Sequence, residues 1–127
     1  MTNPLKDQEK FMRACDQTVG RVNNEINEDQ YDLYLNLIKE EAAELQAAVD
    51  ACDPVEQLDA LIDILVVTIG AIHSAGFDAE GAWKEVMRSN FAKIGEDGKV
   101  RKREDGKVLK PTGWTAPELK QFIKDVK

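Results

Sequence analysis

Residues 54–67, with the sequence PVEQLDALIDILVV, decide the fold, because an apolar run carries acidic side chains at regular spacing. Glu56, Asp59 and Asp63 follow one another at intervals of three and four residues, so they share one side of a helix. Further along this side the residues are apolar or small, and the acidic row is expected to continue into a surface buried against another helix. The residues that continue this side are Val66, Val67 and Gly70.

A second acidic row is expected on the preceding helix, in residues 39–46, KEEAAELQ. Helical periodicity over residues 28–51 places Glu41 inside an apolar stripe, with Glu40 and Glu44 beside it on the same arc. An unpaired carboxylate in such a stripe costs several kcal/mol unless a proton, a cationic side chain or a metal ion neutralises it. The apolar stripe consists of Tyr34, Leu37, Ile38, Leu45 and Ala48.

The two acidic rows are expected to face each other and to need a counter-charge. Two like charges about 4 Å apart repel by about 4 kcal/mol at an effective dielectric constant of about 20. Three neighbouring carboxylates in one cavity need compensation, and no Lys or Arg lies between Glu40 and Trp83. With oxygen ligands only, the expected counter-ion is Mg²⁺ or Mn²⁺, between which the sequence does not choose.

The 127 residues are enough for a single domain, and we expect a helical core in residues 1–95 with residues 96–127 as its basic loop and C-terminal helix. The net charge of -7 argues against duplex nucleic acid as the main partner, because phosphate contacts need a basic face. Cys15 and Cys52 fit no metal or redox spacing and are expected to be reduced core thiols. We also expect no leader, no membrane span and a cytoplasmic protein.

Helical periodicity and capping residues predict four helices joined by short connections, which is typical of an all-α, four-helix bundle-like fold. The only basic region follows, with two EDGK segments suited to tight turns. Thr115, Pro117 and Glu118 predict a short C-terminal helix. The four helices are expected at residues 4 to about 20, 28–51, 54 to about 75, and from after Asp78 to about 94.

Three blocks of the sequence resemble the all-α nucleoside triphosphate pyrophosphohydrolases, the superfamily of MazG-like enzymes, dimeric dUTPases and phosphoribosyl-ATP pyrophosphohydrolases. They are EEAAELQAA at 40–48, DALIDILVVTIGAIHSAGF at 59–77 and EVMRSNFAKIGEDGKVRKREDGKVLKPTGW at 85–114. The third block is most similar to the short, phosphoribosyl-ATP pyrophosphohydrolase-like and phage-type MazG branch. The resemblance implies a homodimer or homotetramer, in which oligomerisation completes the fold. The compact chain is compatible with a phage origin, in which case the protein is expected in the host cytoplasm.

The resemblance also implies a set of metal ligands. The family pattern places two of them at Glu41 and Glu44 and a third at Asp63. The family commonly has Glu at the position of Ala60, and Asp59 is the expected substitute, with Glu56 as the alternative.

Further site residues are implied by the same resemblance. We expect more than one Mg²⁺ or Mn²⁺ per site, with Glu40 binding a further ion or orienting the attacking water. Asn90 and Lys93 are similar to residues directed at the substrate's phosphates, and Arg88 and the basic loop are weaker candidates. Trp114 is expected to stack on a base or to pack against another subunit. The expected catalytic residues are Glu40, Glu41 and Lys93.

The activity implied is hydrolysis of a (deoxy)nucleoside triphosphate to the monophosphate and pyrophosphate, with the base left open. Two alternatives are a phosphoribosyl-ATP pyrophosphohydrolase and a non-catalytic helical adaptor that binds a structural cation. At several positions a structural role is the alternative to a functional one. Glu40 and Glu56 could lie on a solvated face, His73 is more typical of a packed or capping residue, and Trp83 is expected in a core or interface.

Overall fold

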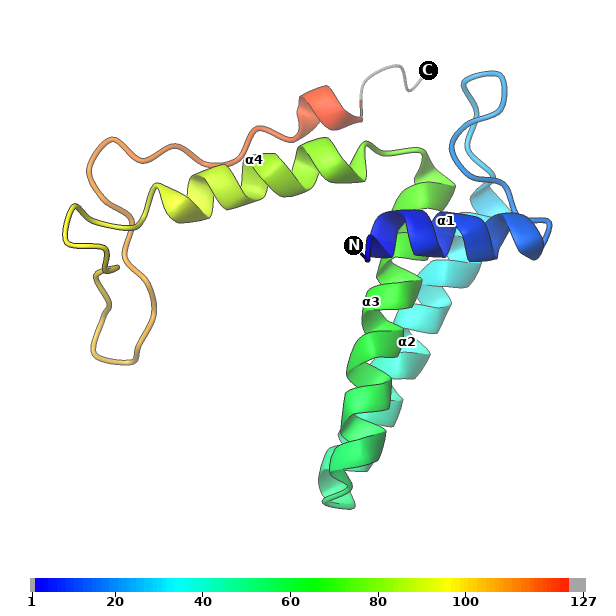
Figure 1. Ribbon diagram of the computed structural model, residues 1–127, viewed down its shortest axis with the longest axis horizontal. Coiled ribbons are helices and arrows are strands. Elements are labelled where there is room, and N and C mark those ends of the chain that lie inside the picture. The colour runs from blue at the N-terminus through cyan, green and yellow to red at the C-terminus, as the bar shows by residue number, and fades with distance from the viewer. Residues whose placement is uncertain (1, 124–127) are drawn as a thin grey trace. The chain divides into compact units, whose positions relative to one another are not determined.

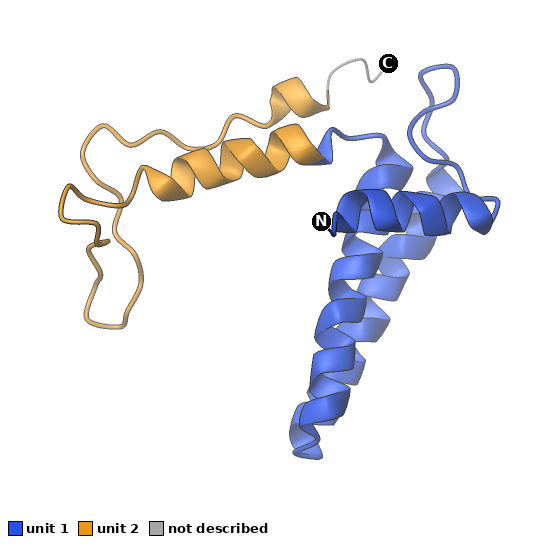
Figure 2. Cartoon of the chain, viewed as in Figure 1, with its two compact units in different colours: residues 1–79, 125–127 blue, residues 80–124 orange. Residues whose placement is uncertain are grey.

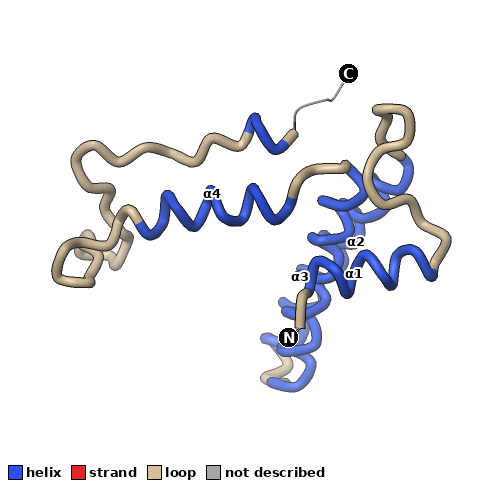
Figure 3. Tube along the Cα trace, turned by 45° about the horizontal axis from the view of Figure 1, so that its top comes forward, coloured by secondary structure: helices blue, strands red, loops and turns tan. Residues whose placement is uncertain are grey.

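The computed structural model describes residues 2–123, within which every regular element is a helix (Figures 1 and 3). The prediction of an all-α fold with four α-helices is confirmed. In that part of the chain only isolated β-bridges accompany the helices, and two of them close the turns of the basic region. The elements are α1 (Pro4–Ala14), α2 (Glu28–Asp50), α3 (Pro54–Ala75), α4 (Ala79–Phe91) and the 3₁₀-helix η1 (Lys120–Phe122).

The chain divides into two compact units (Figure 2). Unit 1 contains α1, α2 and α3 and extends to Ala79, and unit 2 begins at Glu80 and contains nearly all of α4, the basic loops and η1. The boundary between the units falls after Ala79, the first residue of α4. The expected division of one domain at residue 95 stays a prediction.

In unit 1, α2 and α3 form an antiparallel pair that lies side by side along most of its length (Figures 1 and 3), and α1 packs against α3. The core contains Met12, Tyr34, Val67 and Ala71, all of them buried. The side of α3 that faces this core is mostly small, which allows the two helix backbones to approach closely. At Gly70 the ring of Tyr34 occupies the space that a Cβ atom would need.

The turn between α2 and α3 follows from three consecutive residues. The amide of Cys52 donates to Val49 O and the amide of Asp53 donates to Ala48 O, which is the hydrogen-bond pattern of a Schellman motif. Asp53 then accepts a hydrogen bond from the amide of Glu56 and caps α3. The predicted start of α3 at Pro54 is therefore confirmed.

The predicted end of α3 is also confirmed. Gly76 follows the helix with a φ of 71°, in the left-handed region that glycine adopts without steric cost.

The first helix is shorter than the sequence predicts, since it ends at Ala14 rather than near residue 20. Asp16 has a φ of 60°, and the amide of Gln17 donates to Met12 O, so the chain leaves the helix before the expected end. The loop that follows is fixed by Gln30, whose amide bonds both backbone groups of Thr18 and reaches the buried Ser74 hydroxyl at 2.7 Å.

The prediction of buried cysteines is wrong. Cys15 and Cys52 are free thiols, as expected, but both are exposed. Cys15 caps the shortened α1, and Cys52 lies in the α2–α3 turn with a φ of 52°. Neither residue stands on the apolar side of a helix, because each helix ends before it.

In unit 2, the segment after the basic loops runs along α4. Trp114 Nε1 donates to Ser89 O at 2.6 Å, and the amide of Glu118 donates to Glu85 at 2.6 Å. The predicted C-terminal helix is present within residues 2–123 only as η1, and its expected continuation lies outside the described residues. The two Asp-Gly turns form as expected, with Gly98 and Gly106 at positive φ.

Candidate metal site

The expected acidic site lies between α2 and α3 in unit 1. Glu41 stands on the inner side of α2 and is half-buried, as the apolar stripe predicts. One of its carboxylate oxygens, Oε2, is buried and has no hydrogen-bond partner among residues 2–123. A buried acceptor without a donor is costly unless a proton or a cation satisfies it.

The neighbours of Glu41 make that cost larger. A hydrogen bond with the Glu44 carboxyl group, burial, and repulsion from Glu44, Asp63 and Asp59 together raise the pKa of Glu41 to about 7. Glu44, Asp59 and Asp63, the other three expected metal ligands, are therefore close enough to act on Glu41 across the two helices. The structure brings them together from positions up to 22 residues apart.

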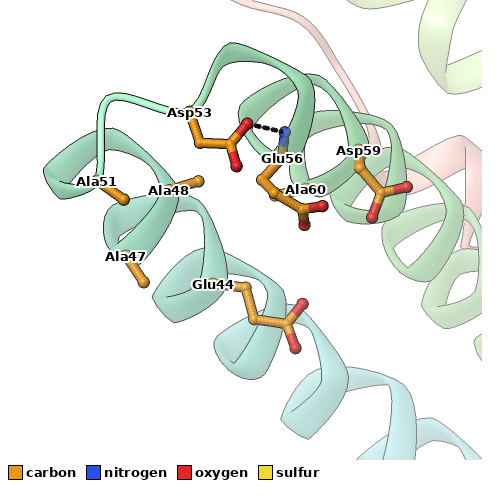
Figure 4. Close-up of a pocket in the computed structure, with 8 residues that line it drawn as sticks. All are labelled: Glu44, Ala47, Ala48, Ala51, Asp53, Glu56, Asp59 and Ala60. Carbon is orange, nitrogen blue, oxygen red and sulfur yellow. Dashed lines mark hydrogen bonds between the residues drawn. The ribbon is translucent and has the colours of Figure 1, made fainter.

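Glu44, Glu56 and Asp59 line a groove of about 530 Å³ at the end of the helix pair that contains the α2–α3 turn (Figure 4). In Figure 4 the Glu44 carboxylate extends from α2 towards the side of α3 that carries the other two. Ala60 is buried in the wall of this groove, at the position where the family pattern has Glu. Both candidates for the fourth ligand, Asp59 and Glu56, thus share the groove with Glu44.

The carboxylates do not form a complete coordination site in this conformation. Among the described residues no three Asp, Glu, His or Cys side chains are close enough to hold an ion as they stand. Glu44 and Asp59 are exposed and Asp63 is half-buried, so their side chains have room to change rotamer. The unpartnered Oε2 of Glu41 and the all-oxygen donor set fit a hard divalent cation.

Glu40 lies outside the inner row. It is exposed on α2, as the solvated-face interpretation predicts, and it has no ion pair among residues 2–123. This position leaves it accessible to water at the edge of the acidic row. Its catalytic role stays a prediction.

The expected phosphate-binding residues belong to unit 2. Lys93 Nζ donates to Asn90 Oδ1 at 3.1 Å, so these two residues form one polar group at the end of α4. Arg88 has a structural partner, since its guanidinium contacts Glu85 at 2.6 Å and lowers the pKa of that carboxyl group. Arg88 also donates to the carbonyls of Thr115 and Ala116, and thus holds the C-terminal segment on α4.

The structure also shows the contacts or exposure of three other residues that the sequence singled out. Trp114 makes the hydrogen bond to Ser89 and lies beneath two lysine ammonium groups. His73 Nε2 lies 2.8 Å from Leu5 O, which agrees with its interpretation as a packed residue that joins α3 to α1. Trp83 is two-thirds exposed on α4, so within a single chain it is not a core residue.

Sequence reasoning did not single out Arg101 and Lys110 from the rest of the basic region. They line a pocket together with Lys93. The nearby Trp114 was the available signal, because an aromatic ring among lysines attracts their ammonium groups.

A sequence model of the phosphoribosyl-ATP pyrophosphohydrolase family matches residues 8–90, which is well over half of the chain. The match contains both acidic rows and ends at Asn90. Comparison with curated proteins finds no match. The chain belongs to the phosphoribosyl-ATP pyrophosphohydrolase family, within the all-α MazG-like superfamily, and is a nucleotide pyrophosphohydrolase.

Proposed function

We propose that this protein hydrolyses a (deoxy)nucleoside triphosphate to the monophosphate and pyrophosphate with Mg²⁺ or Mn²⁺, and so controls a nucleotide pool. The observation that carries the proposal is the half-buried Glu41, which has an unsatisfied oxygen and three carboxylates around it. Such a group is stable as an anion only with a cation beside it. The polyphosphate of a nucleotide needs the same cation to neutralise its own charge.

The ligands we propose are Glu41, Glu44, Asp59 and Asp63. A bound divalent ion would neutralise phosphate oxygens and act as a Lewis acid. The exposed Glu40 would accept the proton of the attacking water, which is a role suited to a carboxylate within reach of solvent. Attack at either the α or the β phosphorus gives the same two products.

Lys93 and Asn90 would bind substrate phosphates through an ammonium group and an amide nitrogen. Their mutual hydrogen bond fixes the side chain of Lys93 near α4. Lys93→Ala is expected to raise KM or lower kcat, because a point charge on a phosphate oxygen would be lost.

Phosphoribosyl-ATP is the second candidate substrate, and the observation that favours it is the family match over residues 8–90. Phosphoribosyl-ATP carries the same triphosphate group, so the same carboxylates would serve. The two substrates differ in the part of the molecule that the acidic row does not contact. A helical adaptor that binds a cation without turnover is the alternative from another class.

The deciding experiment measures pyrophosphate release from all dNTPs, all NTPs and phosphoribosyl-ATP, with Mg²⁺, Mn²⁺ or EDTA. We expect release from at least one dNTP and none in EDTA. Glu41→Gln and Asp63→Asn are expected to abolish turnover while the fold persists, as judged by circular dichroism. Asp32→Asn removes an exposed carboxylate from the same helix and should leave turnover unchanged.

Three outcomes would contradict parts of the proposal. Full activity of both site variants would remove the metal site. Release from phosphoribosyl-ATP alone would make that compound the substrate. An absence of pyrophosphate release across the whole panel would favour the adaptor.

We further propose that the protein is a cytoplasmic homodimer or homotetramer. Its α3 is long and apolar enough to cross a membrane by length and composition, a property that core helices of soluble proteins share. Asp59 and Asp63 interrupt the apolar sequence of this helix, and its exposed apolar side is suited to packing against a second copy.

A further inference from the structure

The C-terminal segment of unit 2 brings two lysines onto one indole ring. Lys93 Nζ lies 5.2 Å from the ring centre of Trp114, and Lys110 Nζ lies 4.8 Å from it. These lysines are 17 residues apart in the chain and meet because Trp114 is anchored to Ser89 O by its Nε1. Ser89 is 2% exposed, so the anchor point is fixed within α4.

The two lysines border a pocket that also contains an arginine. The pocket has a volume of about 370 Å³, and its wall includes no carboxylate. Within residues 2–123, neither Lys93, Lys110 nor Arg101 forms an ion pair, whereas Arg88 and Arg103 each have an acidic partner. The wall consists of Lys93, Ile94, Gly95, Arg101, Leu109, Lys110, Pro111 and Thr112.

Three positive charges around one pocket repel one another, and the face of an aromatic ring offsets only part of that repulsion. The remaining positive potential favours an anion with several oxygens, because such a ligand can contact several donors at once. A guanidinium group and two ammonium groups together suit a diphosphate better than a single carboxylate. The net charge of -7 on the whole chain disfavours a nucleic acid as the ligand.

We infer that Lys93, Arg101 and Lys110 form a binding subsite for the pyrophosphate group of a nucleotide, in which Trp114 positions the two lysines. The inference rests on the proposed function and extends it, by assigning Arg101 and Lys110 to the substrate. Trp114 acts through the lysines, because its ring lies close to both ammonium groups. This subsite belongs to unit 2 alone.

The test measures binding of inorganic pyrophosphate in EDTA at fixed ionic strength. Trp83→Phe removes the other tryptophan, so the fluorescence of the variant reports on Trp114 alone. We expect a saturable change in emission. Lys110→Ala and Arg101→Ala, each in the Trp83→Phe background, should weaken binding about tenfold, since each removes a charge-assisted hydrogen bond.

Lys107→Ala is the matched control, because it removes the same charge from an exposed lysine of the same region that does not line the pocket. It should change binding by no more than about twofold, as expected for a screened distant charge. An equal loss in Lys107→Ala and Lys110→Ala would show general attraction instead of a subsite. A linear, unsaturated response would also overturn the inference.

The positioning role of Trp114 is tested by calorimetric titration with pyrophosphate. Trp114→Leu should weaken binding about fivefold by releasing both lysines, and Trp114→Phe should restore part of it through its ring. Equal affinities in the two variants and the parent would remove the positioning role.

Failure of this inference differs from failure of the proposed function. A protein that binds pyrophosphate at this pocket but hydrolyses no compound of the panel would refute the function and retain the subsite. A protein that hydrolyses a nucleotide while Arg101→Ala and Lys110→Ala keep the parent's KM and pyrophosphate affinity would refute the subsite alone.

Discussion

Gly70 sets how closely α3 approaches α2. A Cβ atom at this position would lie 2.7 Å from Cζ of Tyr34 and closer still to two other ring atoms. The ring cannot move easily, because Tyr34 is 4% exposed and its hydroxyl donates to Gln17 Oε1 at 2.5 Å. Position 70 therefore accepts glycine in spite of its low helix propensity.

We predict that Gly70→Ala lowers the free energy of unfolding by about 1–2 kcal/mol, because overpacking outweighs the gain in helix propensity. Urea denaturation followed by circular dichroism measures the change. In a Tyr34→Leu background the same substitution should be neutral or stabilising. An equal loss in both backgrounds would show that the Tyr34 ring is not the cause.

The carboxyl group of Glu41 predicts a pH-dependent stability of the metal-free protein. Its pKa is raised to about 7 by the hydrogen bond with Glu44, by burial and by the nearby carboxylates, so the folded state binds this proton more tightly than the unfolded chain does. The contribution to stability is present below about pH 4.5 and is lost as the pH rises through about 7. Urea unfolding in EDTA between pH 5 and 8 should show this decline.

Glu41→Gln should flatten the decline and leave the variant more stable than the parent at pH 8, because the amide carries no charge to bury. Addition of Mg²⁺ at pH 8 should stabilise the parent and not the variant. Parallel pH profiles for the two proteins would contradict this account of the site.

At the scale of elements, the α2–α3 turn places a residue with a side chain in the left-handed region. Cys52 has a φ of 52° at the position of a Schellman motif that glycine usually occupies. We predict that Cys52→Gly raises the free energy of unfolding by about 0.5 kcal/mol, since relief of the left-handed strain exceeds the entropy lost with glycine. Thermal denaturation measures the effect.

Cys52→Val should act in the opposite direction, because a β-branched side chain tolerates this conformation worst. Since Cys52 is exposed, neither substitution creates a cavity. Destabilisation by both variants would mean that the thiol itself makes a contact that a single chain does not contain.

At the scale of the whole molecule, α3 exposes a row of large apolar side chains. The most exposed are Val55, Leu58 and Leu65, at 73%, 62% and 58%. Such a contiguous apolar side is uncommon on a monomer and is typical of a protein interface. It supports the proposed oligomer.

We predict that the protein sediments as a dimer or tetramer at micromolar concentration, and that Leu58→Glu with Leu65→Glu yields monomers, since buried charges at an interface are costly. Analytical ultracentrifugation gives the measurement. Asp32→Asn, on the exposed side of α2, should keep the parent's sedimentation. A parent protein that sediments as a monomer would contradict the oligomer.

The sequence by itself determined those helix ends that are marked by local signals. Pro54 and Gly76 mark the ends of α3 through backbone geometry, which needs no tertiary contact. The end of α1 was missed, because Asp16 adopts the left-handed conformation without a sequence signal as strong as glycine. The prediction that Cys15 is buried failed with it, since that prediction assumed a longer α1.

The acidic row on one helix could likewise be predicted from spacing, because residues three and four apart share a face of any α-helix. The sequence also led us to expect that this row faces Asp59 and Asp63, but only the tertiary structure showed that one oxygen of Glu41 is buried without a partner among residues 2–123. It alone also placed Lys110 beside Lys93. Contacts between distant segments depend on packing that local periodicity does not encode, whereas the helix itself is set by neighbours within a few residues.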